Sequence, residues 1–250
     1  MELGSKKRSG DLAEWRQFLR LLGLALTTQP RRVPAMARNY LMFSLSHVLL
    51  ELCPILRRGL VLGKNVRIQR LRSLERFGAD SSIEIGAHTI LYEHARLEAV
   101  GQGKIRIGQY GILGDCRISA RELVHIGHRV LTSWNVFIQD NNPHPVEAEL
   151  RGAQVKNMCR RFYPRTQVER TQQEDEALLL DWSPPTSPVI IGDDVWLGAN
   201  STVLKGARIG AGCIVACGSV VTAGDYPPCS VLAGNPACVV RSLRPYEVEP

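Results

Sequence analysis

Aliphatic residues recur at every sixth position along the C-terminal third of the chain, between residues 188 and 221. They are Ile191, Leu197, Val203, Ile209, Val215 and Val221. An α-helix repeats about every 3.6 residues and a strand every 2, so neither produces this period. A hexapeptide period is typical of a parallel β-helix, in which each unit supplies a short strand and a corner and three units make a coil of about 18 residues.

Small residues follow four of these aliphatic positions. They are Gly192, Gly198, Gly210 and Ala216. Glycine permits the tight turns that a corner between flat sheets needs. The alternative is a phosphate-binding loop, which crowds its glycines into one turn before a helix. Even spacing favours the repeat, and we expect the aliphatic side chains to point inward and to stack, with Ile191 on Ile209.

The same pattern begins more loosely near residue 61. Aliphatic–glycine pairs start at Leu62, Ile85, Ile107 and Ile126, in steps of 23, 22 and 19 residues. These steps predict coils of about 18 residues with small insertions at their corners. The next pair starts only at Ile191, so residues 139–188 form a long excursion from the coils. We predict a β-helix over 61–226 that is interrupted by this excursion.

The two ends of the chain carry other patterns. Residues 1–60 form an N-terminal segment with helical spacing of apolar residues. Within it, residues 40–56 are apolar but short for a membrane span and contain His47 and Glu51. We expect this stretch to pack on the domain, and attachment to a membrane surface is the alternative. The period is lost at two prolines near residue 227, which predicts a loop and cap over 227–250.

Composition narrows the environment more than the activity. The chain of 250 residues is 44% hydrophobic and carries a net charge of +7, which suits an anionic partner without choosing one. Its seven cysteines are odd in number and show no CxxC spacing, which favours a reducing compartment. No apolar signal sequence follows the N-terminal charges. We expect a cytoplasmic protein, with the inner membrane surface as the alternative site.

Three segments together resemble the hexapeptide-repeat O-acetyltransferases, which include sugar, xenobiotic and polysaccharide-modifying enzymes. The segments read PVIIGDDVWLGAN, VVTAGDYPPCSVLAGNPACVVR and NNPHPVEAELR. The resemblance covers roughly residues 60–242. It implies a mainly β, left-handed parallel β-helix, a homotrimer, acetyl-CoA as donor and a hydroxyl acceptor, which we expect on a sugar or surface-polysaccharide intermediate. We expect no metal and no nucleic-acid partner.

The resemblance places the catalytic base at His144. An alcohol must lose its proton as it attacks a thioester, and histidine is the usual base at neutral pH. Pro143 and Pro145 stiffen the chain on both sides of this residue. A base also needs a partner on its other ring nitrogen. Asp140, Asn142 or a backbone carbonyl could supply that partner.

The resemblance also implies contacts to the acyl donor. The corresponding residues are Trp196, Gly198, Ala199, Cys217, Gly218, Thr222 and Arg241. Arginine suits phosphate because its planar guanidinium presents several donors in a fixed arrangement. Two positions depart from the family pattern, since Ala223 and Cys238 stand where basic residues are common. Donor binding would then depend more on Arg241 and Arg244.

Acceptor contacts rest on residue type and on the excursion. Aromatic and polar side chains of the sort that hold sugars are Trp134, Asn135, Phe162, Tyr163 and Trp182. Regular coils offer little shape, so we expect the excursion to select the acceptor. Its arginines at 160, 161 and 165 favour an anionic one. For the trimer, we expect apolar residues such as Ile112, Val136 and Val203 on the flat outer faces.

Two other functions fit the same scaffold. His125 and His128 are spaced as HxxH and, with His88, His94 and His144, suggest a metal-dependent hydratase related to the hexapeptide-repeat carbonic anhydrases. Zinc needs ligands that converge on one point, which two residues in different parts of one hexapeptide do not readily provide. The remaining alternative is a β-helix that only assembles with partners. A fold alone cannot separate these functions.

Overall fold

The computed structural model describes residues 58–160 and 182–243, together with isolated positions between 19 and 41. The helical segment expected over 1–60, with its apolar stretch 40–56, therefore lies almost wholly outside the described residues, and so do Phe162 and Tyr163. No helix in the described part of the chain is long and apolar enough to cross a membrane.

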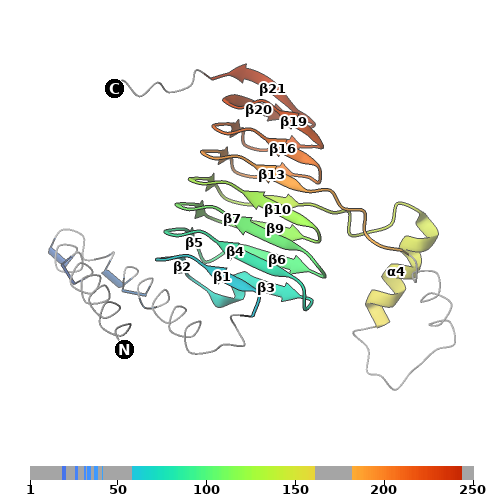
Figure 1. Ribbon diagram of the computed structural model, residues 1–250, viewed down its shortest axis with the longest axis horizontal. Coiled ribbons are helices and arrows are strands. Elements are labelled where there is room, and N and C mark those ends of the chain that lie inside the picture. The colour runs from blue at the N-terminus through green and yellow to red at the C-terminus, as the bar shows by residue number, and fades with distance from the viewer. Residues whose placement is uncertain are drawn as a thin grey trace, which may run out of the picture.

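The coils build three sheets of parallel strands that run the length of the molecule (Figure 1). The first sheet contains, in spatial order, β1 (Leu60–Leu62), β4 (Ser82–Ile85), β7 (Lys104–Ile107), β10 (Leu123–Ile126), β13 (Val189–Ile191), β16 (Ala207–Ile209) and β19 (Gly224–Tyr226). The second contains β2 (Arg67–Ile68), β5 (Ile90–Leu91), β8 (Ile112–Leu113), β11 (Leu131–Thr132), β14 (Trp196–Leu197), β17 (Ile214–Val215), β20 (Ser230–Gly234) and β21 (Ala237–Ser242). The third contains β3 (Leu74–Phe77), β6 (Arg96–Val100), β9 (Cys116–Ala120), β12 (Val136–Gln139), β15 (Thr202–Val203) and β18 (Val220–Val221).

Stacked aliphatic side chains form the core between the sheets. All six aliphatic residues of the hexapeptide run are buried, with exposures of 0–3%. Ile191 pairs with Ile209 across one coil, and the predicted parallel β-helix is confirmed. Val136 and Val203, expected on the outer faces, are 1% and 0% exposed because they stand in the inward phase of the third sheet. Ile112 does face outward and is 40% exposed.

Corner insertions account for the uneven steps between the early coils. Leu60 pairs with Ile83, Ile83 with Ile105 and Ile105 with Val124, so the spacing tightens along the chain. A short 3₁₀ helix, η2 (Leu71–Ser73), occupies one corner of the first coil. Every insertion lies between strands, and the inward phase of the strands is preserved.

The excursion leaves the coils after β12 and returns at β13. Figure 1 shows it carrying a helix, α4 (Ala148–Arg160), that stands away from the coils on the side opposite β2 and β5. Sequence reasoning expected an irregular loop. The helix forms because Ala148–Arg160 is rich in helix-forming residues and carries Glu149 in its first turn, where a negative charge is favourable.

The C-terminal residues continue the second sheet beyond residue 226, where the hexapeptide period predicted the coils to end. β20 pairs in parallel with β17, so the second sheet gains another strand after the two prolines. β21 then folds back antiparallel on β20. The segment expected as a loop and cap is thus a hairpin up to Ser242, which covers the last coil with paired backbone.

Candidate functional site

A buried carboxylate fixes the start of the excursion. Asp140 is 0% exposed, and its side chain accepts hydrogen bonds from the backbone N–H groups of Arg121 and Glu122, both at 2.8 Å. Asn141 Nδ2 donates to Asp140 Oδ1 at 3.0 Å. A buried carboxylate is tolerated when several donors surround it, as they do here. Asp140 therefore ties the root of the excursion to the preceding coil.

The returning chain lies beside the departing one at this root. Ser187 N donates to Asp140 O at 2.9 Å, and Asn142 N donates to Pro185 O at 3.0 Å. Asn141 and Thr186 form an antiparallel bridge between these two contacts. The two ends of the excursion therefore hold each other, and the His144 loop starts from a fixed base.

His144 is exposed, and a side chain from α4 holds its ring. Its Nδ1 lies 2.8 Å from Gln154 Oε1. The Gln154 amide is itself oriented, because its Nε2 donates to Pro143 O at 3.1 Å. An amide whose nitrogen faces a carbonyl must turn its oxygen toward the histidine. An oxygen accepts only from N–H, so the contact requires hydrogen on Nδ1 and leaves the lone pair of Nε2 free.

A second side chain of α4 holds the backbone after His144. Arg151 Nη1 donates to Pro145 O at 3.0 Å and to Val146 O at 2.7 Å. Pro145 itself is buried. Contacts from one helix thus reach carbonyls on both sides of His144. The backbone on either side of His144 is therefore tied to α4.

The partner expected for His144 differs from the one in the structure. Asp140 had been a candidate, but its carboxylate is occupied by the backbone of the preceding coil. Asn142 uses its backbone N–H to pair with the returning chain, and the ring nitrogen contacts Gln154 instead. Sequence reasoning missed Gln154 because it lies ten residues after His144. A helix over 148–160 brings the two together. The helix-forming residues of this segment were therefore the signal in the sequence that pointed to Gln154.

Four of the predicted donor residues meet at one corner, between the second and third sheets. Gly198 and Ala199 lie one coil before Cys217 and Gly218, and Gly218 N donates to Ala199 O at 2.8 Å. A Cβ on Gly198 would lie 2.6 Å from Val215 O, so the next coil can approach only a glycine here. Gly218 has a φ of +72° and open space where a Cβ would stand. We call the whole edge the second corner, comprising residues 92–95, 114–115, 133–135, 198–200 and 216–218.

Of the other predicted donor residues, Trp196 lies beside this corner, whereas Arg241 and Thr222 lie apart from it. Trp196 faces outward on β14 with 45% exposure and donates from Nε1 to Ser133 Oγ at 3.0 Å. Arg241 pairs with Val231 on the terminal hairpin. Thr222 follows β18, at the opposite end of that strand from Gly218, and its carbonyl accepts from the Tyr226 hydroxyl at 3.2 Å. One bound molecule would have to be extended to contact all of them.

Two of the predicted acceptor residues also lie at the second corner. Trp134 is 76% exposed, and its carbonyl accepts from Asn200 N at 2.9 Å. Asn135 Nδ2 donates to Asn200 Oδ1 at 2.8 Å. Trp182 is half-buried in the returning part of the excursion. Tyr163 lies outside the described residues.

Two of the histidines proposed for the hydratase have other contacts. His128 Nδ1 accepts from Gln109 N at 2.9 Å, and the His88 ring stacks on Tyr110 with centroids 4.8 Å apart. His125 lies on β10 at the outward position of the first sheet. Over residues 58–160 and 182–243, no three His, Cys, Asp or Glu side chains are placed to hold one metal ion.

The buried thiols are poor nucleophiles. Burial raises the pKa of Cys116 to about 12, and it also raises the pKa of Cys213. Cysteine reacts as the thiolate, so neither side chain suits covalent chemistry near neutral pH. Cys217 at the second corner is exposed.

Comparisons with known proteins agree with the repeat. The family described as bacterial transferase hexapeptide, six repeats, matches residues 188–223. The 2,3,4,5-tetrahydropyridine-2,6-dicarboxylate N-acetyltransferase of Staphylococcus aureus is 53% identical over 58 residues, which are 23% of this chain and 24% of that protein. The chain thus aligns with about a quarter of the length of the curated relatives it matches.

Two solved structures share the fold. AntD, an N-acyltransferase from Bacillus cereus in complex with dTDP and 3-hydroxybutyryl-CoA, has a TM-score of 0.54 at 17% identity, covering 76% of this chain and 87% of that one. The polySia-specific acetyltransferase NeuO has a TM-score of 0.51 at 19% identity, with the same coverage of 76% and 87%. At such identities the likeness establishes the β-helix and no more.

Proposed function

We propose that this chain, a hexapeptide-repeat protein of the bacterial transferase type, moves an acyl group, acetyl in the simplest case, from coenzyme A to a hydroxyl of a sugar or sugar-bearing intermediate. The observation that carries the proposal is the His144–Gln154–Pro143 arrangement. It leaves an exposed, oriented Nε2 lone pair, which is what a general base needs.

The proton transfers follow from that geometry. Nε2 of His144 takes the hydroxyl proton as the acceptor oxygen bonds to the thioester carbonyl carbon. The carbon–sulfur bond then breaks, and the imidazolium returns the proton to the departing thiolate, which gives the free thiol and the ester. Gln154 Oε1 stabilises the imidazolium through the Nδ1 hydrogen throughout, as the third member of a catalytic triad does.

The second corner is the proposed donor site. Gly218 leaves open space beside exposed backbone, which lets an extended chain such as pantetheine lie close. Arg241 supplies a guanidinium for phosphate. Two of the similar proteins support a coenzyme A donor, because the S. aureus relative is an acetyltransferase and AntD was solved with an acyl-CoA.

An amino group is the second candidate acceptor, since both the S. aureus relative and AntD are named as N-acyltransferases. A protonated amine must also lose a proton before it attacks, so His144 would serve either acceptor. NeuO, which is named as specific for polySia, supports a saccharide acceptor without choosing between the two groups. Parallel assays with hydroxyl-only and amino sugars decide between the two.

We further propose a homotrimer, supported by a row of apolar side chains on the outer face of the second sheet. The row runs through six consecutive coils as Ile90, Ile112, Leu131, Trp196, Ile214 and Val231. An uninterrupted apolar row gains by burial, and cyclic symmetry closes the assembly. Sedimentation at micromolar concentration tests the assembly, and a monomer would contradict it.

Assembly of several copies would also bring His144 within reach of a second corner. Within one copy, the second corner lies before β12 and His144 lies after β12. The 4 residues of this strand separate them by about 13 Å, at 3.3 Å per residue. The excursion then continues away from the coils (Figure 1). A base from one copy acting at the second corner of another would bring these groups together.

The test combines activity with mixing of subunits. Release of free thiol from acetyl-CoA is followed with a panel of sugars, for wild type, His144→Ala and Cys217→Trp, which fills the second corner. Mixed assemblies of the two inactive variants should recover part of the activity. Failure of wild type to release thiol with any acceptor, or hydration activity that depends on added zinc, would overturn the transferase.

A further inference from the structure

The second corner is one residue shorter in the third coil than in the coils beside it. Its inward side chains are Leu91 then Ala95, Leu113 then Cys116, and Thr132 then Val136, all buried. The buried residues on the two sides of this corner are therefore four positions apart in the second coil, three in the third and four in the fourth. The shorter corner cannot extend as far as its neighbours, because a missing residue removes about 3.3 Å of chain. A notch is left between His94 and Asn135.

The notch is large enough for a small polar molecule. It has a volume of about 390 Å³ and is lined by side chains from three consecutive coils, including Arg96, Asp115, Arg117 and Phe137. Binding pockets for small molecules start at about 300 Å³. The notch belongs to the same edge as Gly198 and Gly218.

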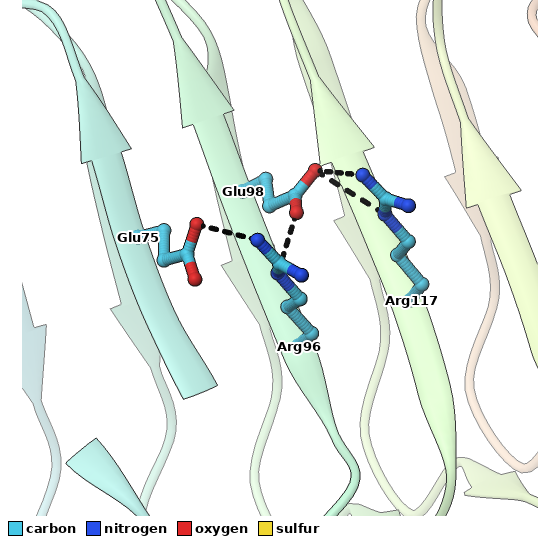
Figure 2. A network of polar contacts seen from close by, with 4 residues as sticks. All are labelled: Glu75, Arg96, Glu98 and Arg117. Carbon is cyan, nitrogen blue, oxygen red and sulfur yellow. Dashed lines mark hydrogen bonds and ion pairs between the residues drawn. The ribbon is translucent and has the colours of Figure 1, made fainter. Parts of the chain in front are cut away.

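A network of carboxylates holds the two arginines in place (Figure 2). Arg96 Nε lies 2.6 Å from Glu98 Oε1, and Arg117 Nη2 lies 3.0 Å from Glu98 Oε2. Arg96 Nη2 also donates to Glu75 Oε2 at 2.9 Å. The Glu98 side chain is only 9% exposed, so it is a fixed anchor between two half-exposed guanidinium groups. Each guanidinium keeps a further nitrogen that forms no hydrogen bond or ion pair with any described residue.

The charges of this site balance without an anion. Two arginines face Glu75 and Glu98, which already neutralise them. Asp115 then adds a carboxylate that forms no hydrogen bond or ion pair with any other described residue. A negatively charged ligand would meet this carboxylate and gain little from guanidinium groups that are already paired. The surroundings favour a neutral ligand.

The polar groups around the notch include both donors and acceptors. Asp115 and the Oδ1 of Asn135, whose Nδ2 is bonded to Asn200, accept hydrogen bonds. Arg96 and Arg117 donate them. Phe137, which pairs with Arg117 across β12 and β9, adds a half-buried aromatic face. Each sugar hydroxyl is both donor and acceptor, and the C–H face of a sugar ring can lie on an aromatic ring.

We infer that the notch binds one neutral sugar unit, and that this unit belongs to the acceptor. Only the statement that this sugar unit belongs to the acceptor rests on the proposed function. It places the sugar on the same edge as the proposed donor residues, with Trp134 and Asn135 between the two. The excursion then need not supply the whole pocket for the acceptor.

The experiment measures binding without acyl-CoA. Saturation-transfer NMR and titration with maltose, galactose and N-acetylglucosamine are carried out on the full chain, with inorganic phosphate as the anionic comparison. We expect at least one saccharide to bind, on the order of millimolar because the site is open and small. His144→Ala should bind it unchanged.

Asp115→Asn distinguishes a neutral saccharide from an anion, because the affinities of the two should change in opposite directions. Losing the carboxylate removes a charge-assisted acceptor, so saccharide binding should weaken about 10-fold. An anion site would instead bind phosphate more tightly in the same variant. The Asp115 side chain makes no hydrogen bond or ion pair with any other described residue, so the substitution should leave the fold intact. Asp80→Asn, at an exposed aspartate outside the notch, is the control. Tighter phosphate binding, no saccharide binding, or equal binding in Asp115→Asn and wild type would each overturn the inference.

The outcome is distinguishable from failure of the proposed function. Thiol release from acetyl-CoA with an acceptor, together with no saccharide in the notch, would leave the transferase standing and end the inference. Saccharide binding that Asp115→Asn weakens, with no transfer to any acceptor, would support the notch and overturn the transferase.

Discussion

In the coils, each inward side chain rests on its equivalent one coil away, whereas the residues of the excursion have no equivalent to rest on. Leu197 stacks between Thr132 and Val215, and this pattern repeats in every coil. His144 depends on Gln154 and on the carbonyl of Pro143. Repeats contact only their neighbours, so stability accumulates along the stack. The excursion must hold one arrangement by specific polar contacts.

The comparison predicts that stability resides in the coils and proton transfer in the excursion. A substitution inside the stack should therefore lower the free energy of unfolding and spare the chemistry that remains in folded molecules. A substitution at the His144 loop should do the reverse. The following changes test this division, starting with the largest expected effect.

Leu197→Ala should cost the most stability. The side chain is 0% exposed, and its removal leaves a cavity that neighbouring coils cannot fill, which costs about 2–5 kcal/mol. Denaturant unfolding measures the loss. Val146→Ala, in the excursion at 79% exposure, is the control and should change stability by less than about 0.5 kcal/mol. Similar losses from both substitutions would mean that the excursion is part of the same stack.

His144→Ala should give the largest loss of activity. Removing a general base lowers turnover by at least about 100-fold, the lower end of such contributions, while CoA binding and stability stay near wild type. Steady-state kinetics and a thermal melt measure the two properties. His125→Ala, on the outer face of β10, is the matched control and should retain full activity. Near-normal turnover in His144→Ala would remove this residue from the mechanism.

The same division explains what the sequence could and could not predict. A period of six constrains every coil in the same way, so the inward phase of Ile191 and its stacking on Ile209 follow from spacing alone. The terminal hairpin was not predicted, because the side chains of β20 still alternate between the core and the surface although the hexapeptide period has ended. Gln154 could not be found from spacing, since its contact with His144 requires the helix to fold back over the loop. The notch depends on one missing residue between buried positions, and only the strand pairing of all the coils defines which positions are equivalent.

Gln154→Leu tests whether the excursion positions its base through one amide. The change keeps most of the side-chain volume but removes the hydrogen bonds to His144 and to Pro143. We expect turnover to fall about 10-fold, because the wrong tautomer and other ring positions become populated. Glu149→Gln, at an exposed site in the same helix, should leave turnover unchanged.

Gln154→Glu adds a readout that a purely structural role would not move. A carboxylate beside Nδ1 stabilises the protonated ring, so the free base would form only at higher pH. The acid limb of kcat/KM should therefore move to higher pH, while Gln154→Leu should lower the whole profile. An unshifted profile in Gln154→Glu would show that the amide does not act on His144.

Asp194→Asn should have the smallest effect, because it removes an interaction on the outside of the coils. Arg129 Nε lies 2.6 Å from Asp194 Oδ1, but both side chains are about half-exposed, where water and salt weaken ion pairs. The hydrogen bond from Arg129 lowers the pKa of Asp194 below its ordinary 3.8. A lowered carboxyl pKa stabilises the fold at pH values above the ordinary one, and this contribution disappears as the pH falls through the lowered value. Asp194 has a φ of +59°, which asparagine also adopts readily, so the substitution changes charge without straining the corner. Melts of wild type and variant should therefore differ slightly at neutral pH and converge both in acid and at high salt. A difference that persists in acid would mean that the corner depends on this side chain for more than its charge.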